Sequence, residues 1–384
     1  MIPYGRQDIT GDDIAAVADV LRSDFLTQGP QVPAFEQAVA ERCQASHAVA
    51  VNSATSALHI ACLALGLGRG DILWTSPITF VASANCGLYC GAQVDFVDID
   101  PATFTIAPAA LEEKLEAAEK QGRLPRVLVV VHMSGHSANM EAIAALARRY
   151  GVRIIEDAAH AIGASQHGHP VGSCRYSDIT VFSLHPVKII TSAEGGMALT
   201  NDAELARRMV ELRSHGITRD PARLRHDDAP WYYEQQALGF NYRMPDVLAA
   251  LGHSQLARLD DYIATRHAIA GRYEELLADL PLILPRRDPF GRSALHLYIV
   301  QLDETRTQKS RRAVFLAMRA AGIGVQVHYI PVHLQPVYRQ MGFSPGMFPA
   351  AERYYARAMS LPIFPRLRDE EQEQVAGALR EALQ

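Results

Sequence analysis

Helical and strand-like patterns of apolar residues alternate along the first half of the chain. Apolar residues recur at helical spacing over Asp12–Ser23 and Val32–Cys43, and a strand is then predicted at 47–53. Further strands are predicted at 71–77, 92–99, 126–133, 152–157, 179–183 and 197–200, with helices at 55–67, 80–90, 108–121 and 139–151. This alternation predicts an α/β fold, in which right-handed crossovers build a mostly parallel sheet covered by helices on both faces.

The C-terminal part of the chain follows a different pattern. Residues 246–279 are almost continuously helical, and after them come a strand at 294–302, a helix at 308–322, a strand at 323–332 and a terminal helix at 369–384. We therefore predict three segments: an N-terminal arm and helix (1–30), a large domain (31–259) and a smaller C-terminal α+β domain (260–384). No Gly/Ser-rich linker separates the last two, so they are expected to pack together with a cleft between them.

The charge pattern and the N-terminal sequence exclude several classes of protein. The chain has 384 residues and a net charge of −5, with acidic and basic residues interspersed, so no basic face for nucleic acid is expected. The first residues, MIPYGRQDIT, lack the charged and apolar regions of a signal peptide, and the apolar runs are too short to span a bilayer. We expect a cytoplasmic protein without nucleic-acid or membrane partners.

Cysteine and histidine residues give no sign of a metal site. The five cysteines form no C-x-x-C pair and mostly lie in apolar stretches, as expected of small core residues in a reducing compartment. The fifteen histidines include no H-E-x-x-H or similar ligand spacing. The sequence therefore predicts neither a metal nor a disulfide framework.

Two strand ends carry polar residues that suit a bound ligand, because ligands of such sheets bind at the carboxyl ends of the strands. The turn from Asn52 to Thr55 joins a strand to a helix, where free N–H groups and hydroxyls favour an anion such as phosphate. Ser and Thr are also common helix caps, so the turn is compatible with capping alone. Asp157 ends an apolar strand, where a buried carboxylate needs a cationic partner.

Lys188 follows a third strand end. Ile179–Ser183 is typical of a buried strand, and the proline in the stretch from His185 to Lys188 ends its pairing. Gly195-Gly196 and the apolar run Met197–Thr200 complete a hairpin-like excursion that would hold Lys188 over the edge of the sheet. On position alone, Lys188 is also compatible with an ordinary solvated lysine.

These three places fit one ligand. A molecule with a phosphate, a protonated ring nitrogen and an aldehyde would place its phosphate at Ala54, Thr55 and Ser183. Its ring nitrogen would lie at Asp157, and its aldehyde at Lys188. That ligand is pyridoxal 5′-phosphate (PLP): Asp157 would keep the ring nitrogen protonated, and Lys188 would form the Schiff base and serve as catalytic general base.

Two further residues lie close to this constellation in the sequence. Phe80 follows the strand predicted at 71–77 and could stack on the cofactor ring, although a core aromatic residue would show the same pattern. His160 falls one turn after Asp157, where it could reach the ring hydroxyl or stack on the ring. A core or capping histidine is the alternative interpretation of that position.

Four stretches in this order carry a resemblance to a known family: EDAAHAIGA, VFSLHPVKIITSAEGGMALTN, RSHGITRD and LGFNYRM. They resemble the DegT/DnrJ/EryC1/StrS family of sugar-nucleotide aminotransferases, and the resemblance runs from IPYG to LPIFP, nearly the whole chain. Within the family, IPYGRQ, DFLTQGP, NSATSAL, PWYYEQQALGFNYRM and VQVHYIPVHLQPVY are most similar to the transaminases of pseudaminic acid biosynthesis.

The resemblance implies a PLP-dependent transferase of fold type I, like aspartate aminotransferase, and a homodimer with shared active sites. It implies that Asn241 reaches the cofactor phosphate of the neighbouring subunit. It also implies a nucleotide-sugar site, whose residues would be Tyr4, Asp24, Phe25, Leu26, Thr27, Ala54, Ser183, Asn241, Gln326, Val327, His328 and Tyr329.

The implied reaction moves the amino group of L-glutamate to C4 of a UDP-4-keto-6-deoxy-N-acetylhexosamine, giving UDP-4-amino-4,6-dideoxy-N-acetyl-β-L-altrosamine. The sequence leaves open whether the ketosugar is this L-arabino form, the D-xylo epimer of a bacillosamine-type enzyme, or another nucleotide-linked ketosugar. Three competing hypotheses are a PLP-dependent sugar dehydratase, a PLP-binding regulator, and a nucleotide-sugar scaffold without PLP. Lys188 argues against the dehydratase, since those relatives carry histidine at the lysine position.

Overall fold

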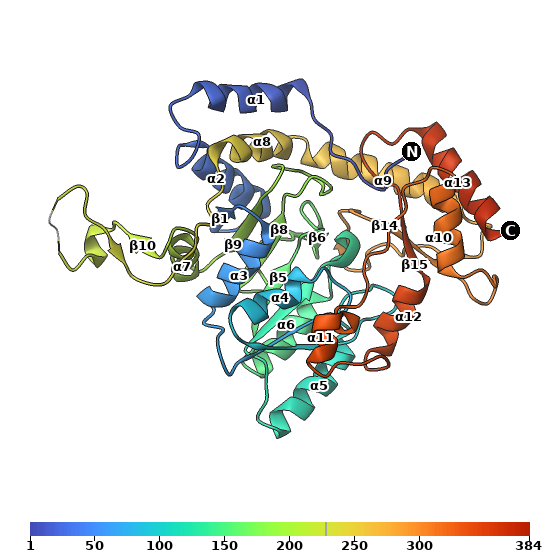
Figure 1. Ribbon diagram of the computed structural model, residues 1–384, viewed down its shortest axis with the longest axis horizontal. Coiled ribbons are helices and arrows are strands. Elements are labelled where there is room, and N and C mark those ends of the chain that lie inside the picture. Colours follow the sequence, from blue (N-terminus) through green and yellow to red (C-terminus); the bar gives the residue numbers. More distant parts are fainter. Residues whose placement is uncertain (227–228) are drawn as a thin grey trace.

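A seven-stranded sheet forms the centre of the protein, which the computed structural model describes over residues 1–226 and 229–384 (Figure 1). The strand order is β1-β9-β8-β5-β4-β2-β3, and within this sheet β9 runs in the direction opposite to that of the other strands. The predicted α/β class with a mostly parallel sheet is therefore confirmed. The strands are β1 (His47–Val51), β2 (Ile72–Thr75), β3 (Gln93–Phe96), β4 (Val127–Val131), β5 (Arg153–Asp157), β8 (Ile179–Ser183) and β9 (Gly196–Thr200).

Side chains of the central strands alternate between two buried faces. In β4, Val127 and Val129 belong to the core under α3 and α4, whereas Leu128 and Val130 belong to the core under α5 and α6. Both sets are apolar because helices cover both faces. The first face carries α3 (Ala54–Ala64), α4 (Ala82–Tyr89) and α7 (Ala203–Arg213); the second carries α2 (Gln31–Cys43), α5 (Pro108–Lys120), α6 (Met140–Arg149) and α8 (Asp246–Leu256).

A second sheet of three antiparallel strands lies in the C-terminal part of the chain. It has its own apolar core, formed with three helices. Leu297 and Ile299 belong instead to the core of the large sheet, so the two parts are packed together. The division into segments at residues 30 and 259 stays a prediction. The elements are β12 (Leu282–Ile283), β14 (Tyr298–Leu302), β15 (Ala358–Leu361), α9 (Leu259–Leu276), α10 (Arg311–Ala320) and α13 (Asp369–Leu383).

Shorter elements complete the chain. The pair β10–β11 projects from the body as an arm (Figure 1). The shorter elements of the chain are α1 (Gly11–Arg22), β6 (Ser165–Gln166), β7 (His169–Pro170), β10 (Ile217–Thr218), β11 (Glu234–Gln235), β13 (Gly291–Arg292), α11 (Pro336–Gln340), α12 (Pro349–Arg357) and the 3-10 turns η1 (Met133–Gly135), η2 (Pro221–Arg223) and η3 (Val332–Leu334).

Two expectations about the C-terminal part were wrong in detail. The helix expected over 246–279 is interrupted between α8 and α9, at Ala257 and Arg258. The strand expected at 323–332 does not form a ladder: only Ile323 and Gln326 make isolated bridges. The alternating pattern there has another cause, since Ile323 and Val325 pack into the C-terminal core while the chain beyond them turns toward the large sheet.

Two buried charged residues fix the outer helices. Asp13 of α1 is fully buried and accepts hydrogen bonds from Ser254 and Gln255 in α8 and from Arg258 just after it. Arg266 of α9 is also buried, and its Nη1 donates to the carbonyl oxygens of residues 295, 296 and 363, each at 3.2 Å. These contacts join segments that lie far apart in the chain.

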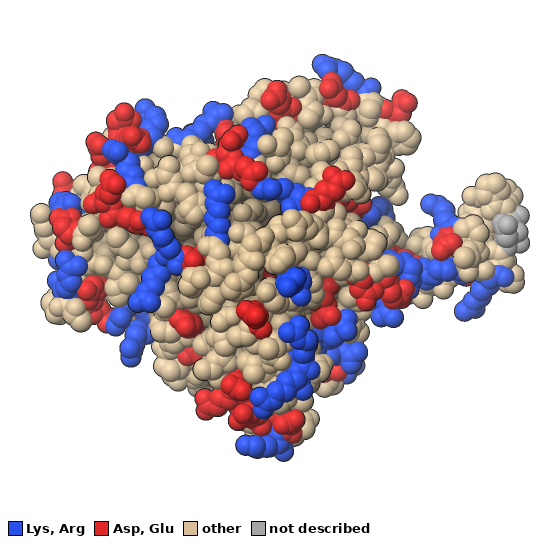
Figure 2. All heavy atoms as spheres, turned by 180° about the vertical axis from the view of Figure 1, so that it is seen from behind, with Lys and Arg blue, Asp and Glu red and all other residues tan. Residues whose placement is uncertain are grey.

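Charges of both signs are mixed over the molecular surface. Figure 2 shows Lys and Arg side chains interspersed with Asp and Glu over the face opposite to that of Figure 1. Within residues 1–226 and 229–384, no helix is long and apolar enough to cross a membrane.

Candidate active site

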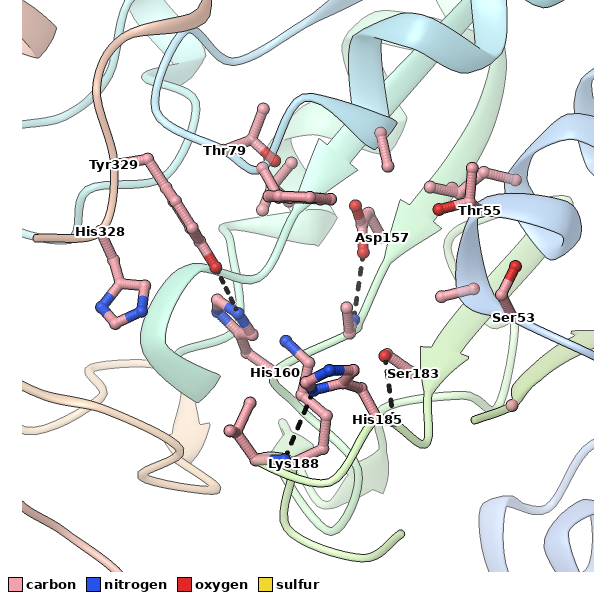
Figure 3. Close-up of a pocket in the computed structure, with 18 of the residues that line it drawn as sticks. Ser53, Thr55, Thr79, Asp157, His160, Ser183, His185, Lys188, His328 and Tyr329 are labelled. Atoms are coloured by element: carbon pink, nitrogen blue, oxygen red, sulfur yellow. Dashed lines mark hydrogen bonds between the residues drawn. The ribbon is translucent and has the colours of Figure 1, made fainter. Parts of the chain in front are cut away.

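A cavity of about 390 Å³ opens at the carboxyl ends of the central strands. Segments that are distant in sequence supply its walls: the β1–α3 turn, the β2–α4 loop, the end of β5, the β8–β9 excursion and the segment before η3 (Figure 3). Ten of the residues predicted from the sequence line it: Tyr4, Ala54, Thr55, Phe80, Asp157, His160, Ser183, Lys188, His328 and Tyr329.

Lys188 lies on the excursion between β8 and β9. The two strands form the expected hairpin, in which Ser183 pairs with Gly196, and the Lys188 N–H donates to the carbonyl of His185 at 2.9 Å. Burial lowers the pKa of the Lys188 amine to about 8, although the Asp157 carboxylate opposes the shift. A lysine in this range carries a substantial neutral fraction near pH 7 to 8, and the neutral amine is the nucleophile.

Asp157 is held at the end of β5 by two donors. The Ser83 hydroxyl donates to Oδ2 at 2.5 Å, and the backbone N–H of Ala159 donates to Oδ1 at 3.1 Å. Ser83 lies in α4 and also contacts the Thr79 hydroxyl at 2.6 Å. Each carboxylate oxygen can accept a further hydrogen bond, so Asp157 presents a fixed, buried anion to the cavity.

The first turn of α3 borders the cavity on another side. The Ser53 hydroxyl caps this helix by accepting from the Ser56 N–H at 3.1 Å, so the capping interpretation holds for Ser53. Ala54 and Thr55 line the cavity at the same helix N-terminus, where N–H groups and the helix dipole favour an anion. Gly196 allows the close approach, since a Cβ there would lie 2.5 Å from the Ser53 carbonyl oxygen.

His160 and Tyr329 meet across the cavity. His160 Nδ1 lies 3.3 Å from the backbone N–H of Ser134, which can only donate, so Nδ1 is the acceptor. Burial, together with the charges of Lys188 and His328, lowers the pKa of His160 well below its ordinary value, so the ring is neutral. Its proton therefore lies on Nε2, which donates to the Tyr329 hydroxyl at 3.1 Å (Figure 3). The Tyr329 hydroxyl proton is left for another acceptor.

Seven predicted residues lie outside this cavity. Asp24, Phe25, Leu26 and Thr27 form an exposed loop between α1 and α2. Gln326 and Val327 precede the lining residue His328, and Asn241 is exposed at the base of the β10–β11 arm, bridged to Ser214. Within one chain these seven do not join the other ten, so their assignment to a site stays a prediction.

Sequence reasoning missed several residues of the site. Ser83 supports Asp157 although it lies 74 positions away, and its place inside a helical pattern gave no signal. Thr79 could have been found, since it precedes Phe80 in the same loop after β2. His185 and Glu194 lie 4.0 Å apart in the segment that connects β8 to β9, and both line the cavity.

The lining residues fit PLP. The N-terminus of α3 supplies donors for a phosphate, Asp157 supplies an anion for a protonated ring nitrogen, and Lys188 supplies an amine with a lowered pKa for an aldehyde. All three groups border one cavity large enough for a small cofactor.

Known proteins with sequences and structures similar to this chain also support a PLP-dependent aminotransferase. SpsC of Bacillus subtilis, a spore coat polysaccharide biosynthesis protein, is 39% identical over 99% of this chain and 96% of its own length. The structure of PseC from Helicobacter pylori, an aminotransferase of pseudaminic acid biosynthesis, is 30% identical with a TM-score of 0.89, covering 100% of this chain and 99% of that one.

A third relative is the putative sugar aminotransferase Spr1654 of Streptococcus pneumoniae, whose structure is known in PLP and pyridoxamine phosphate (PMP) forms. The PLP form is 28% identical with a TM-score of 0.89 and covers 100% of both chains; the PMP form has a TM-score of 0.91. The profile of the DegT/DnrJ/EryC1/StrS aminotransferase family matches residues 7–380. The chain belongs to this family of PLP-dependent sugar aminotransferases.

Proposed function

We propose that this aminotransferase moves the amino group of L-glutamate to C4 of a UDP-4-keto-6-deoxy-N-acetylhexosamine, giving UDP-4-amino-4,6-dideoxy-N-acetyl-β-L-altrosamine. The proposed amino transfer rests on one observation: Lys188, Asp157 and the N-terminus of α3 line the same cavity. Similarity to PseC supports the choice of sugar. The relationship to SpsC makes a different 4-ketosugar the alternative to be tested.

Each residue has a proposed role. The cofactor supplies an electron sink and carries the amino group between the two substrates. Asp157 keeps the ring nitrogen protonated, and Ser83 holds the carboxylate in place. Lys188 binds the aldehyde and moves the proton at the carbon that gains or loses nitrogen. Ser183, Ala54 and Thr55 hold the phosphate.

The part of the cavity wall lined by Tyr4 and His328 is proposed to receive the sugar. Tyr4 and His328 lie there in ring contact, 5.4 Å between centroids, and the His328 Nδ1 lies 2.8 Å from the Ser360 hydroxyl. Phe80 is 58% exposed on a cavity wall, although it is a large apolar residue. A flat exposed ring at this place suits stacking on the cofactor or on a sugar face.

A homodimer with shared sites is part of the proposal. Asn241, at the base of the β10–β11 arm, is exposed in a single chain and does not line the cavity of its own subunit. The arm also exposes Trp231 by 77% and Leu238 by 81%, which is unusual for such apolar side chains on a free surface. Packing this arm against a second copy would cover them and bring Asn241 to the other subunit's phosphate.

The test uses purified protein loaded with PLP. Addition of L-glutamate should convert the bound cofactor from its yellow form to the colourless PMP form, and 2-oxoglutarate should appear. The PMP form should then aminate the L-arabino UDP-4-ketosugar, with the product identified by mass spectrometry and NMR. Turnover of only the D-xylo epimer, or of only a dTDP-linked ketosugar, would overturn the proposed sugar. Failure to react with glutamate would overturn the proposed donor.

A further inference from the structure

A second cavity, of about 340 Å³, is bordered by helix α9 and by the segment that connects β12 to β14. Among the residues that the structure describes, it has no lining residue in common with the cofactor cavity, and the proposed amino transfer does not use it. Its wall is rich in charged and polar side chains. Helix α9 contributes His267, Gly271 and Glu274, and the connecting segment contributes Arg286, Arg287 and Arg292.

The three arginines of this wall differ in their partners. Arg287 Nη2 donates to Glu274 Oε2 at 3.2 Å. Arg286 and Arg292 are exposed, and within residues 1–226 and 229–384 neither forms an ion pair with a carboxylate. Two positive charges therefore border the cavity without a partner of opposite charge. A planar guanidinium group binds carboxylate or phosphate oxygens through two parallel N–H donors, so the cavity favours an anion.

Asp288, which lies between these arginines in the sequence, is engaged by backbone donors. Its Oδ1 accepts from the Phe290 N–H at 2.9 Å, and its Oδ2 accepts from the Ser137 N–H at 3.0 Å. These bonds tie the connecting segment to the loop after η1. The backbone of Arg292 is also fixed, since β13 pairs with β6 and places Arg292 opposite Ser165. The segment that carries the two unpaired arginines is therefore preorganised.

Tyr298, the first residue of β14, is a buried polar residue of the same wall. It is 1% exposed, and its hydroxyl has no hydrogen-bond partner in the described part of the chain. Burial and the neighbouring Glu274 carboxylate raise the pKa of Tyr298, so the hydroxyl keeps its proton and remains a donor. A buried hydroxyl without an acceptor destabilises the fold. An oxygen atom of a ligand bound beside Tyr298 would supply that acceptor.

Two histidines add donors to the cavity wall. His267 Nε2 lies 2.8 Å from the Ser293 carbonyl oxygen, which only accepts, so Nε2 carries a proton. His136 is buried, and burial lowers the pKa of His136, with His267 adding to the shift and Asp288 opposing it. A neutral imidazole still donates from one ring nitrogen. His136 is therefore a donor that an anion can use.

Gly271 leaves room for a ligand in this cavity. Glycine weakens a helix interior, yet Gly271 lies inside α9. A Cβ added there would meet no neighbouring atom within 4 Å, so the packing of α9 does not require glycine. The missing side chain instead keeps open the part of the cavity that Gly271 lines.

We propose that this cavity binds the phosphate group of a small phosphate monoester. Arg286 and Arg292 provide the charged contacts, Tyr298 provides the inner donor, and the space beside Gly271 receives the organic part of the ligand. A phosphate monoester carries about 1.5 to 2 negative charges at neutral pH, which matches two unpaired guanidinium groups, whereas a single carboxylate matches one. The cavity is larger than a phosphate group alone and has a volume typical of small-molecule sites.

Isothermal titration calorimetry of the PLP-loaded protein measures this binding, with inorganic phosphate and glycerol 3-phosphate as probes. PLP occupies the cofactor's own phosphate site, so the probes cannot bind there. One saturable site per chain is expected, and glycerol 3-phosphate should bind more tightly than inorganic phosphate. No saturable binding of either probe at millimolar concentrations would overturn the proposal. Tighter binding of succinate would also overturn it, because the site would then be one for dicarboxylates.

Substitutions of the two unpaired arginines locate the site. Arg286→Gln and Arg292→Gln should each weaken the binding of glycerol 3-phosphate about tenfold, since a charge-assisted contact is lost. Arg312→Gln is the matched control, because Arg312 in α10 is also exposed and, within the described ranges, also lacks an ion pair. Equal affinities of the wild type and all three variants would place the binding elsewhere and overturn the site.

Gly271→Leu fills the cavity without changing a charge and should abolish binding. The matched control is Gly377→Leu in α13, where an added Cβ also meets nothing within 4 Å, and it should bind like the wild type. Unaltered affinity of Gly271→Leu would overturn the site.

Tyr298→Phe tests the inner donor. It should weaken binding roughly fivefold, since one hydrogen bond is lost. Without phosphate it should not lower Tm, because the hydroxyl has no partner among the described residues. Unaltered affinity of this variant would overturn the role of the hydroxyl. All of these measurements use no aminotransferase substrate, so a protein without aminotransferase activity would contradict the proposed function and leave the test of this site unaffected.

Discussion

His160 donates a hydrogen bond from Nε2 to the hydroxyl of Tyr329, which leaves the tyrosine proton directed to another acceptor. The direction follows from the backbone N–H of Ser134, which occupies Nδ1, and from the buried, neutral state of the ring. Burial and the nearby Asp157 also raise the pKa of Tyr329, so its hydroxyl stays protonated. Tyr329 is thereby prepared to donate to an oxygen of cofactor or substrate.

Tyr329→Phe should lower kcat/KM roughly tenfold, because one hydrogen bond of about 1.5 kcal/mol to the reacting complex is lost. The protein should still fold and bind PLP. Steady-state kinetics with glutamate and the ketosugar provide the measurement, and Tyr176→Phe on the other side of the molecule is the matched control. An unchanged kcat/KM would show that the hydroxyl faces no ligand.

The lowered pKa of Lys188 predicts the pH dependence of cofactor attachment. Below the pKa of about 8 the amine is an ammonium ion and cannot add to an aldehyde, so covalent uptake of PLP by the apoprotein should accelerate as the pH rises through about 8. The change in absorbance with time gives the rate at each pH. A midpoint near 10.5, the ordinary value, would contradict the burial argument. Lys188→Ala should abolish both covalent attachment and turnover.

Substitutions at Asp157 and Ser83 measure how much the hydrogen bond between these two residues contributes to activity. Asp157→Asn removes the anion that holds the ring proton, and we expect a loss of kcat of about a hundredfold or more. Ser83→Ala removes only one donor to that anion and should cost about tenfold, since one charge-assisted hydrogen bond is lost. If Ser83→Ala were as active as the wild type, positioning of Asp157 by α4 would be refuted. Thr200→Val, at the far end of β9 from the cavity, is the control for loss of a buried hydroxyl.

Mixed dimers test whether Asn241 serves the partner's site. Lys188→Ala and Asn241→Ala subunits, each with little activity alone, are mixed, dissociated and reassociated. With shared sites, each mixed dimer has one site carrying both lesions and one carrying neither, so activity should return. If Asn241 acted within its own chain, both sites would stay damaged and no activity would be regained. Purification through two different tags, one on each subunit, isolates the mixed dimers for the assay.

Asp13 should make stability depend on pH at the acidic end. Burial alone raises the pKa of this carboxyl, but hydrogen bonds from Arg258, Ser254, Gln255 and the Thr10 N–H outweigh it and lower the pKa to about 2. An unfolded aspartate has a pKa of about 3.9, so the ionised Asp13 side chain stabilises the fold by about 2 kcal/mol above that pH. This contribution is lost as the pH falls through about 2.

The corresponding measurement compares urea unfolding of the wild type and Asp13→Asn. The free energy of unfolding should be lower for the variant by about 2 kcal/mol at pH 7, and the difference should shrink as the pH is lowered from about 4 toward 2. Asp19→Asn, on the exposed side of α1, should show no such difference. A constant difference at all pH values would mean that the Asp13→Asn variant is destabilised by altered packing rather than by the loss of charge.

Site residues that follow a buried strand could be predicted from the sequence. Site residues that contact a residue far away in the sequence could not. Lys188, Asp157 and the turn at Ala54 and Thr55 each follow an apolar strand, and parallel strands bring such ends to one edge. Ser83 stands inside a helical pattern, so nothing local indicates that it faces Asp157. The alternating stretch 323–332 misled because alternation also arises where a non-strand segment is buried on one side.

The antiparallel strand β9 has a consequence for how this enzyme can diversify. β8 and β9 form a continuous antiparallel ladder in which Ser183 pairs with Gly196. The loop that carries Lys188 therefore begins and ends at fixed positions of the sheet. A slip by one residue would exchange the side chains that pack in the two cores on either side of the sheet, so the two ends of this loop are held in register. Tyr4 and His328 come from segments outside that hairpin. The proposed sugar contacts of Tyr4 and His328 can therefore change while the lysine keeps its place.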